Sequence, residues 1–171
     1  MSGNELKRTA PRLGKRETVQ VKVCGLTRAD EAVACAQAGV HAVGCVFYAK
    51  SPRCVTAAAA REIRRALPPE VSCVGVFVDE PFEGVMATAS QAGLTAVQLH
   101  GNEPPVLVER LRRQGLFVIK ALFADRMPRL EEGAQYSPSA FLVECGRGPL
   151  PGGNAQDWDW SRAGPFPDLH P

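Results

Sequence analysis

Several features that mark specialised protein classes are scarce in this chain. Aromatic residues make up only 6% of the 171 residues and are scattered, so they form no stacking platform for nucleic-acid bases. The formal net charge of +2 is too close to zero to indicate a nucleic-acid partner. Apolar runs of about 18 residues, which a membrane-spanning helix needs, do not occur. The sequence therefore predicts no nucleic-acid partner and no membrane partner.

The six cysteines lack the pattern of a disulfide framework. They stand mostly inside apolar segments, form no C-x-x-C pair and follow no secretory signal. We therefore predict reduced, buried thiols in a cytoplasmic protein. The cysteines are Cys24, Cys35, Cys45, Cys54, Cys73 and Cys145.

The composition that the chain does have is that of an ordinary globular protein, 45% hydrophobic and 22% charged. Residues 1–18 differ from the rest because they are basic and show no apolar periodicity. A targeting peptide or an anion-binding arm would fit this composition, but a disordered leader fits it better, and we assign it no function. The folded part is predicted over 19–161, followed by an irregular proline-rich tail at 162–171.

From residue 19 onward, short apolar runs alternate with helix-like stretches. The runs are nearly continuous and rich in β-branched residues, which is typical of strands buried on both faces of a parallel sheet. Glycine or proline follows each main helical stretch, as expected at helix ends, and Thr56 is a predicted N-cap. The predicted strands are Val19–Cys24, Ala42–Tyr48, Ser72–Val78, Ala96–Leu99, Phe117–Leu122 and Ala140–Glu144, and the predicted helices are Ala29–Ala38, Ala57–Leu67, Phe82–Ala92 and Pro104–Gln114.

This alternation predicts an α/β fold of the TIM (β/α)8 barrel type. Six β/α units can be counted before the sequence becomes irregular, so the barrel is expected to be truncated after about six units. An open six-stranded doubly wound sheet is the alternative. In a partial barrel the first and sixth strands would keep unpaired edges, which favours aggregation.

Polar side chains that could take part in catalysis stand at the ends of the predicted strands. In a β/α barrel the carboxyl ends of the strands converge on one face, where catalysis takes place. This arrangement favours the barrel over the open sheet. The strand-end segments are Cys24, Lys50–Arg53, Asp79–Glu80, Gln98–Gly101 and Glu144–Cys145.

Short motifs accompany these strand ends: KVCGLT at 22–27, SPR at 51–53, VFV at 76–78, VQLHGNE at 97–103, and PGGN at 151–154 with WDW at 158–160. Any one of them arises by chance. In this order and at these separations, they resemble the phosphoribosylanthranilate isomerase family of tryptophan biosynthesis.

The resemblance implies an enzyme that acts on a small phosphorylated substrate without a metal or a cofactor. The implied reaction is the Amadori rearrangement of N-(5-phosphoribosyl)anthranilate to 1-(2-carboxyphenylamino)-1-deoxyribulose 5-phosphate. An acid must protonate the ribose ring oxygen, and a base must remove the proton from C2. In the family the base is the thiolate of the KxCG cysteine, which is Cys24 here, and electropositive surroundings would favour that thiolate. Outside the motif, a buried core thiol would be the simpler interpretation of Cys24.

The family's acid is usually an aspartate at the end of the sixth strand, where this chain has Glu144. Glutamate is one methylene longer, so its use as the acid requires compensating shifts in the 146–153 loop. A salt-bridged or solvated rim carboxylate is the alternative. Arg53 matches the family arginine that contacts substrate, and its guanidinium suits the carboxylate of an anthranilate. The other predicted substrate-binding residues are Gln98, His100, Gly152 and Gly153.

Two interpretations of function remain open at this point. Barrels of this kind usually bind phosphate with loops after strands seven and eight, and only Pro151–Asn154 is available here as part of an anion nest. The chain is either an active isomerase, as a monomer or a homodimer, or an inactive partial barrel that needs a partner chain for stability. We expect weak or no activity from the 171 residues alone. A pentulose-phosphate epimerase is disfavoured, because such enzymes usually hold a metal with His and Asp and this chain has three histidines.

Overall fold

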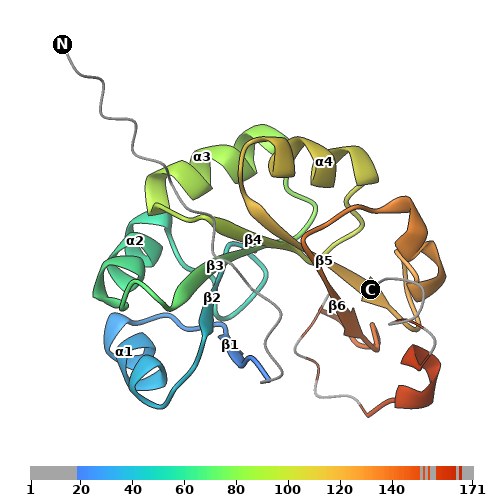
Figure 1. Ribbon diagram of the computed structural model, residues 1–171, viewed down its shortest axis with the longest axis horizontal. Coiled ribbons are helices and arrows are strands. Elements are labelled where there is room, and N and C mark those ends of the chain that lie inside the picture. The colour runs from blue at the N-terminus through green and yellow to red at the C-terminus, as the bar shows by residue number, and fades with distance from the viewer. Residues whose placement is uncertain (1–18, 151, 153, 155–156, 165, 167–171) are drawn as a thin grey trace.

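The computed structural model describes residues 19–150, 152, 154, 157–164 and 166 (Figure 1). The basic leader predicted at 1–18 and most of the tail predicted at 162–171 lie outside these residues. Within the described part, β/α units follow one another along the chain, as the alternation of the sequence predicts.

Six strands form one parallel sheet whose spatial order follows the chain, from β1 to β6. A doubly wound sheet reverses its strand order and carries helices on both faces. Here the order never reverses, and Figure 1 shows helices α1 to α4 around the outside of a curled sheet. The barrel type is therefore confirmed and the doubly wound alternative is wrong. The strands are β1 (Lys22–Cys24), β2 (Ala42–Val46), β3 (Ser72–Phe77), β4 (Ala96–Leu99), β5 (Phe117–Phe123) and β6 (Ala140–Glu144).

The helices begin and end within one residue of the predicted positions. Thr56 caps α2 as predicted, because its hydroxyl oxygen accepts a hydrogen bond from Ala59 N at 3.2 Å. Gly93 ends α3 in the left-handed conformation that glycine adopts without strain. The helices are α1 (Ala29–Gln37), α2 (Ala57–Ala66), α3 (Phe82–Ala92) and α4 (Pro105–Arg113), with 3-10 helices η1 (Leu130–Gln135) and η2 (Trp160–Ala163).

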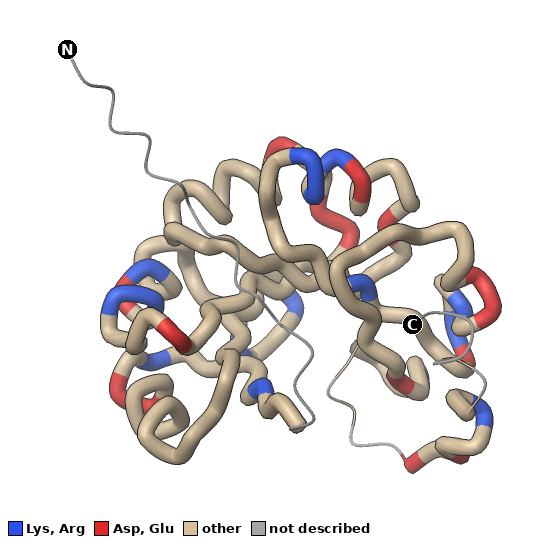
Figure 2. Tube along the Cα trace, viewed as in Figure 1, with Lys and Arg blue, Asp and Glu red and all other residues tan. Residues whose placement is uncertain are grey.

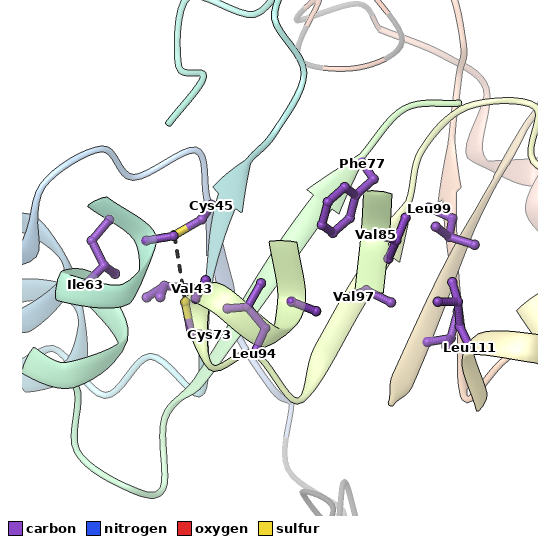
Figure 3. Close-up of a cluster of buried hydrophobic side chains, with 14 of the residues drawn as sticks. Val43, Cys45, Ile63, Cys73, Phe77, Val85, Leu94, Val97, Leu99 and Leu111 are labelled. Atoms are coloured by element: carbon purple, nitrogen blue, oxygen red, sulfur yellow. Dashed lines mark hydrogen bonds between the residues drawn. The ribbon is translucent and has the colours of Figure 1, made fainter. Parts of the chain in front are cut away.

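The main core lies between the convex face of the sheet and the helices (Figure 3). Side chains alternate along β3: Cys73 and Phe77 pack into this core, while Val74 and Val76 line hollows on the opposite, concave face. Charged residues gather on the outer helices and on loops (Figure 2). Catalytic side chains on such a sheet must therefore come from the concave side and from the strand ends.

Two expectations from the sequence need correction. The first strand begins at Lys22 and not at Val19, which is 85% exposed, and the second ends at Val46 because the chain turns at Tyr48–Ser51. The prediction of buried thiols is wrong for Cys24, which ends a strand at the edge of the sheet, and for Cys54, which lies in a loop.

The buried thiols of the core are Cys45, Cys73 and Cys145. The sulfur atoms of Cys45 and Cys73 lie 3.8 Å apart on neighbouring strands (Figure 3). This thiol contact, together with burial, raises the pKa of Cys45 above its ordinary value. Cys45 is therefore a packing residue whose thiol stays protonated.

Sheet pairing leaves two strands with open edges, as the partial barrel predicts. Among the described residues, β1 pairs only with β2, and β6 pairs only with β5. Both strands end in predicted catalytic residues, Cys24 and Glu144.

Candidate functional site

A cavity of about 250 Å³ opens at the carboxyl ends of the strands, on the concave side of the sheet. Parallel barrels place their reactive side chains at this end. The cavity brings together Cys24, Arg53, Gln98, His100, Glu144 and Gly152, which are six of the seven site residues predicted from sequence. The seventh, Gly153, lies outside the described residues.

The thiol of Cys24 stands at the end of β1, where the chain leaves the sheet through Gly25. The backbone continues the sheet for two more hydrogen bonds, since the N–H groups of Gly25 and Leu26 both donate to the Gly44 carbonyl. Gly44 itself carries no side chain, and this leaves room for the thiol: a Cβ atom there would lie 2.7 Å from Cys24 Sγ. Cys24 is consequently exposed to the cavity while its backbone is fixed.

Arg53 reaches the same strand end from the loop between β2 and α2. Its Nη1 donates a hydrogen bond to the Cys24 carbonyl oxygen at 3.0 Å. The guanidinium passes over Gly25, which has a φ of +86° and whose missing Cβ would overlap the arginine side chain. Arg53 is exposed and forms no ion pair among the described residues, so most of its N–H donors remain available to an anionic ligand.

Gln98, His100 and Glu144 form a chain of contacts across the floor of the cavity. Gln98 Nε2 lies 2.7 Å from His100 Nδ1, and because an amide nitrogen only donates, Nδ1 accepts. The other ring nitrogen, Nε2, faces Glu144 Oε2 at 2.8 Å. These two atoms are at ion-pair distance but not aligned for a regular hydrogen bond. Glu144 thus lies beside a buried imidazole, and the Glu144 side chain is 26% exposed.

The loop after β6 closes over this pair. Gly152 lies so near that a Cβ atom on it would stand 3.0 Å from Glu144 Oε2 and would overlap His100. Asn154 holds the loop, because its Nδ2 donates to the Leu150 carbonyl oxygen at 2.7 Å. Gly152 therefore lines the cavity, and its lack of a side chain permits the approach.

The VQLHGNE motif divides into two parts with different roles. Gln98 and His100 face the cavity, whereas Glu103 is buried outside it and accepts hydrogen bonds from Gly101 N at 2.9 Å and Asp79 N at 3.1 Å. Its other oxygen meets Lys120 Nζ at 2.7 Å. Burial lowers the pKa of Lys120 below its ordinary value, against the opposing attraction of Glu103. This half of the motif positions loops and does not contact the cavity.

The cavity also has lining residues that the sequence analysis did not name as site residues. Tyr48, Ser51, Val78 and Leu150 also line it. Ser51 and Val78 stand in motifs at the ends of predicted strands, and this position is a sequence signal for the cavity. Leu150 comes from the irregular loop after β6, whose path no local pattern predicts.

Neither a metal cluster nor a membrane span is visible in the part of the chain that the structure describes. No group of three His, Cys, Asp or Glu side chains is placed to hold a metal ion among residues 19–150 and the described positions beyond them. No helix in the same region is long and apolar enough to cross a membrane.

Comparison with known proteins agrees with this geometry. A sequence profile described as N-(5'phosphoribosyl)anthranilate (PRA) isomerase matches residues 21–165. An N-(5'-phosphoribosyl)anthranilate isomerase from Desulfatibacillum aliphaticivorans is 48% identical over 145 residues, which cover 85% of this chain and 66% of the relative. The chain thus spans about two thirds of the length of that curated relative.

Solved structures give the same result. The phosphoribosyl anthranilate isomerase of Thermus thermophilus superposes with a TM-score of 0.79 at 36% identity, covering 88% of this chain and 72% of that one. A second isomerase structure, in complex with reduced 1-(o-carboxyphenylamino)-1-deoxyribulose 5-phosphate, superposes with a TM-score of 0.75 at 36% identity, covering 88% of this chain and 71% of that one. The similarity therefore extends over nearly all of the described residues.

Proposed function

The chain belongs to the N-(5'-phosphoribosyl)anthranilate isomerase family, and we propose that it catalyses the family reaction. The substrate is N-(5-phosphoribosyl)anthranilate and the product is 1-(2-carboxyphenylamino)-1-deoxyribulose 5-phosphate, in tryptophan biosynthesis. The relative solved with a reduced form of this product supports the substrate class, because it superposes on the strands that carry the cavity. We place the enzyme in the cytoplasm, as a monomer or a homodimer.

The reaction is an internal redox exchange between two sugar carbons, so it needs proton transfers only. Glu144 donates a proton to the ribose ring oxygen, the C1–O bond breaks, and the anilino nitrogen pushes its electron pair to C1 to form an iminium. Cys24, as the thiolate, then removes the proton from C2 and leaves an enolamine. Tautomerisation of the enolamine gives the ketone at C2, so that C2 is oxidised and C1 is reduced.

The positions of the side chains suit these roles. Cys24 on β1 and Glu144 on β6 enter the same cavity from the two end strands of the sheet, so a sugar between them would meet one on each side. Arg53 is fixed beside Cys24 and offers a planar pair of donors to the anthranilate carboxylate. Gln98 and His100 support Glu144, and Gly152 would lie over the substrate.

One observation carries the proposal: the thiol, the guanidinium and the carboxylate that the motifs assign to the reaction line a single cavity at the carboxyl ends of the strands. The inactive partial barrel is less well supported. It offers no reason for a continuous site on β1, β4 and β6, or for the glycines at positions 25, 44 and 152, where side chains of the site lie close.

Loss of phosphoribosylanthranilate fluorescence tests the proposal with the purified chain, with Cys24→Ala as the matched control. In place of the weak or absent activity expected from the sequence, the assembled cavity leads us to expect turnover, which disappears in Cys24→Ala while the circular dichroism spectrum stays unchanged. Folded wild-type protein without turnover, or equal turnover in both proteins, would contradict the proposal.

A further inference from the structure

The side chains of Lys22 and Cys24 both lie close to Gly44 of the neighbouring strand, which has no side chain of its own. They lie two residues apart in β1, so both side chains leave the same face of the sheet. A Cβ atom built on Gly44 of β2 would lie 2.7 Å from Cys24 Sγ and 3.2 Å from Lys22 Nζ. The ammonium and the thiol are therefore at most about 6 Å apart, a separation at which a positive charge favours the ionised form of an acid.

No carboxylate accounts for the charge of Lys22. The side chain lines a second hollow of about 140 Å³ on the concave face, whose walls include Val74, Phe117 and Ile119 and contain no acidic residue. Lys22 forms no ion pair with any other described residue. Its titratable neighbour in this hollow, His41, accepts a hydrogen bond from Val21 N at 3.2 Å. The half-buried ammonium thus has no carboxylate beside it among the described residues, and a thiolate at Cys24 would supply the opposite charge.

We propose that Lys22 is a positioning residue that holds Cys24 in its thiolate form by electrostatic attraction. The inference rests on the proposed function, in which this thiolate is the base. Lys22 thus acts on the reaction through Cys24 and does not contact the reacting carbon.

Other charged and titratable groups also face Cys24. Arg53, from the loop after β2, is a second unpaired cation near it: Nη1 donates to the Cys24 carbonyl oxygen, and the remaining donors are assigned to the substrate carboxylate in the proposed function. Tyr48 carries no positive charge, and His100 contacts Gln98 and Glu144. Glu144 on β6, when ionised, repels a thiolate across the cavity. Lys22 is therefore the cation that is left for the thiolate when a bound carboxylate engages Arg53.

The pH dependence of Cys24 alkylation by iodoacetamide tests this inference, because the thiolate is the reacting form. Mass spectrometry of the peptides follows Cys24 and the exposed Cys54 separately in the full chain. We expect Lys22→Met to move the midpoint of the Cys24 profile upward by about one pH unit. Lys22→Arg should keep the wild-type midpoint, and Arg61→Met, which removes an equal charge from an exposed position on α2, should change nothing. The Cys54 profile should stay fixed in every variant.

An unchanged Cys24 midpoint in folded Lys22→Met would overturn the inference. A higher KM with an unchanged midpoint would overturn it as well, because it would place Lys22 on the substrate anion. Should Lys22→Met fail to fold, Lys22→Gln takes its place with the same expected shift and the same contrary result. Turnover is measured in parallel: wild-type protein without turnover refutes the proposed function, whereas the alkylation profile alone decides the role of Lys22.

Discussion

Lys120 Nζ and Glu103 Oε2 lie 2.7 Å apart, and their side chains are 0% and 1% exposed. The pair joins β5 to the loop after β4, while the backbone N–H of Asp79 ties the loop after β3 to the same carboxylate. Both loops are therefore held by one buried carboxylate, that of Glu103. A buried ion pair contributes little net stability, but an unpaired member of it is strongly destabilising.

Removal of the Glu103 charge should accordingly unfold the chain readily. We expect Glu103→Gln to lower the free energy of unfolding by about 3–5 kcal/mol, because it leaves the Lys120 ammonium buried without a partner. Urea denaturation measures the change. Glu109→Gln, which breaks the exposed pair with Arg113, is the control and should cost about 1 kcal/mol or less. Equal losses in the two variants would contradict the structural role of Glu103.

Gly25 and Gly39 allow a matched test of how Arg53 is held. Both have a φ of +86°, so alanine at either position carries a similar backbone strain of about 1–2 kcal/mol. A Cβ on Gly25 would overlap Arg53, whereas nothing lies within 4 Å of one on Gly39. We expect Gly25→Ala to raise KM by roughly tenfold through displacement of the guanidinium, and Gly39→Ala to leave KM unchanged. Steady-state kinetics that show the same KM in both variants would contradict this assignment.

The role of Glu144 depends on its proton and not only on its polarity. Glu144→Gln keeps the length of the side chain but cannot donate the proton, so kcat should fall by about 10²–10⁴-fold with little change in KM. Glu144→Asp keeps the acid and moves it by one methylene, so we expect a smaller loss. Wild-type kcat in Glu144→Gln would show that the acid is another group.

Asp125 makes the free energy of unfolding depend on pH in the acidic range. Hydrogen bonds from Arg162 and Arg147, the former stronger, hold its pKa below the ordinary value of 3.8. Because the folded-state pKa is depressed, the stabilisation is present above pH 3.8 and is lost as the pH falls through the folded-state value. We expect wild type to exceed Asp125→Asn in stability to urea at pH 7, and the gap to close below pH 3.8. A gap that is independent of pH would contradict this ion-pair network.

The sequence predicted the fold well where the evidence was local. Helix ends were marked by glycine and by the Thr56 hydroxyl, and apolar runs marked the strands, because both signals act within a few residues. The first strand was predicted to start too early, at Val19, and the second to end too late, at Tyr48. Apolar character alone does not show that a residue has a pairing partner in the sheet. Membership of Cys24 and Glu144 in one site followed from the barrel topology and the motifs.

Other features of the site depend on contacts between residues far apart in sequence. No local pattern shows that Glu103 reaches Lys120, or that Gly44 leaves space in which Lys22 and Cys24 meet. Packing of neighbouring strands creates both relationships, and pairing register decides them. The exposure of Cys24 likewise follows from its place on an edge strand, where the general preference of cysteine for the interior does not apply.

Protection of Cys24 from iodoacetamide by reduced 1-(o-carboxyphenylamino)-1-deoxyribulose 5-phosphate tests the central claim most directly. This compound is the one bound in the superposable isomerase, and the claim is that its counterpart occupies the cavity between Cys24 and Glu144. The account predicts that saturating compound slows alkylation of Cys24 and leaves the rate at Cys54, outside the cavity, unchanged. Alkylation of Cys24 at the same rate with and without the compound would contradict it.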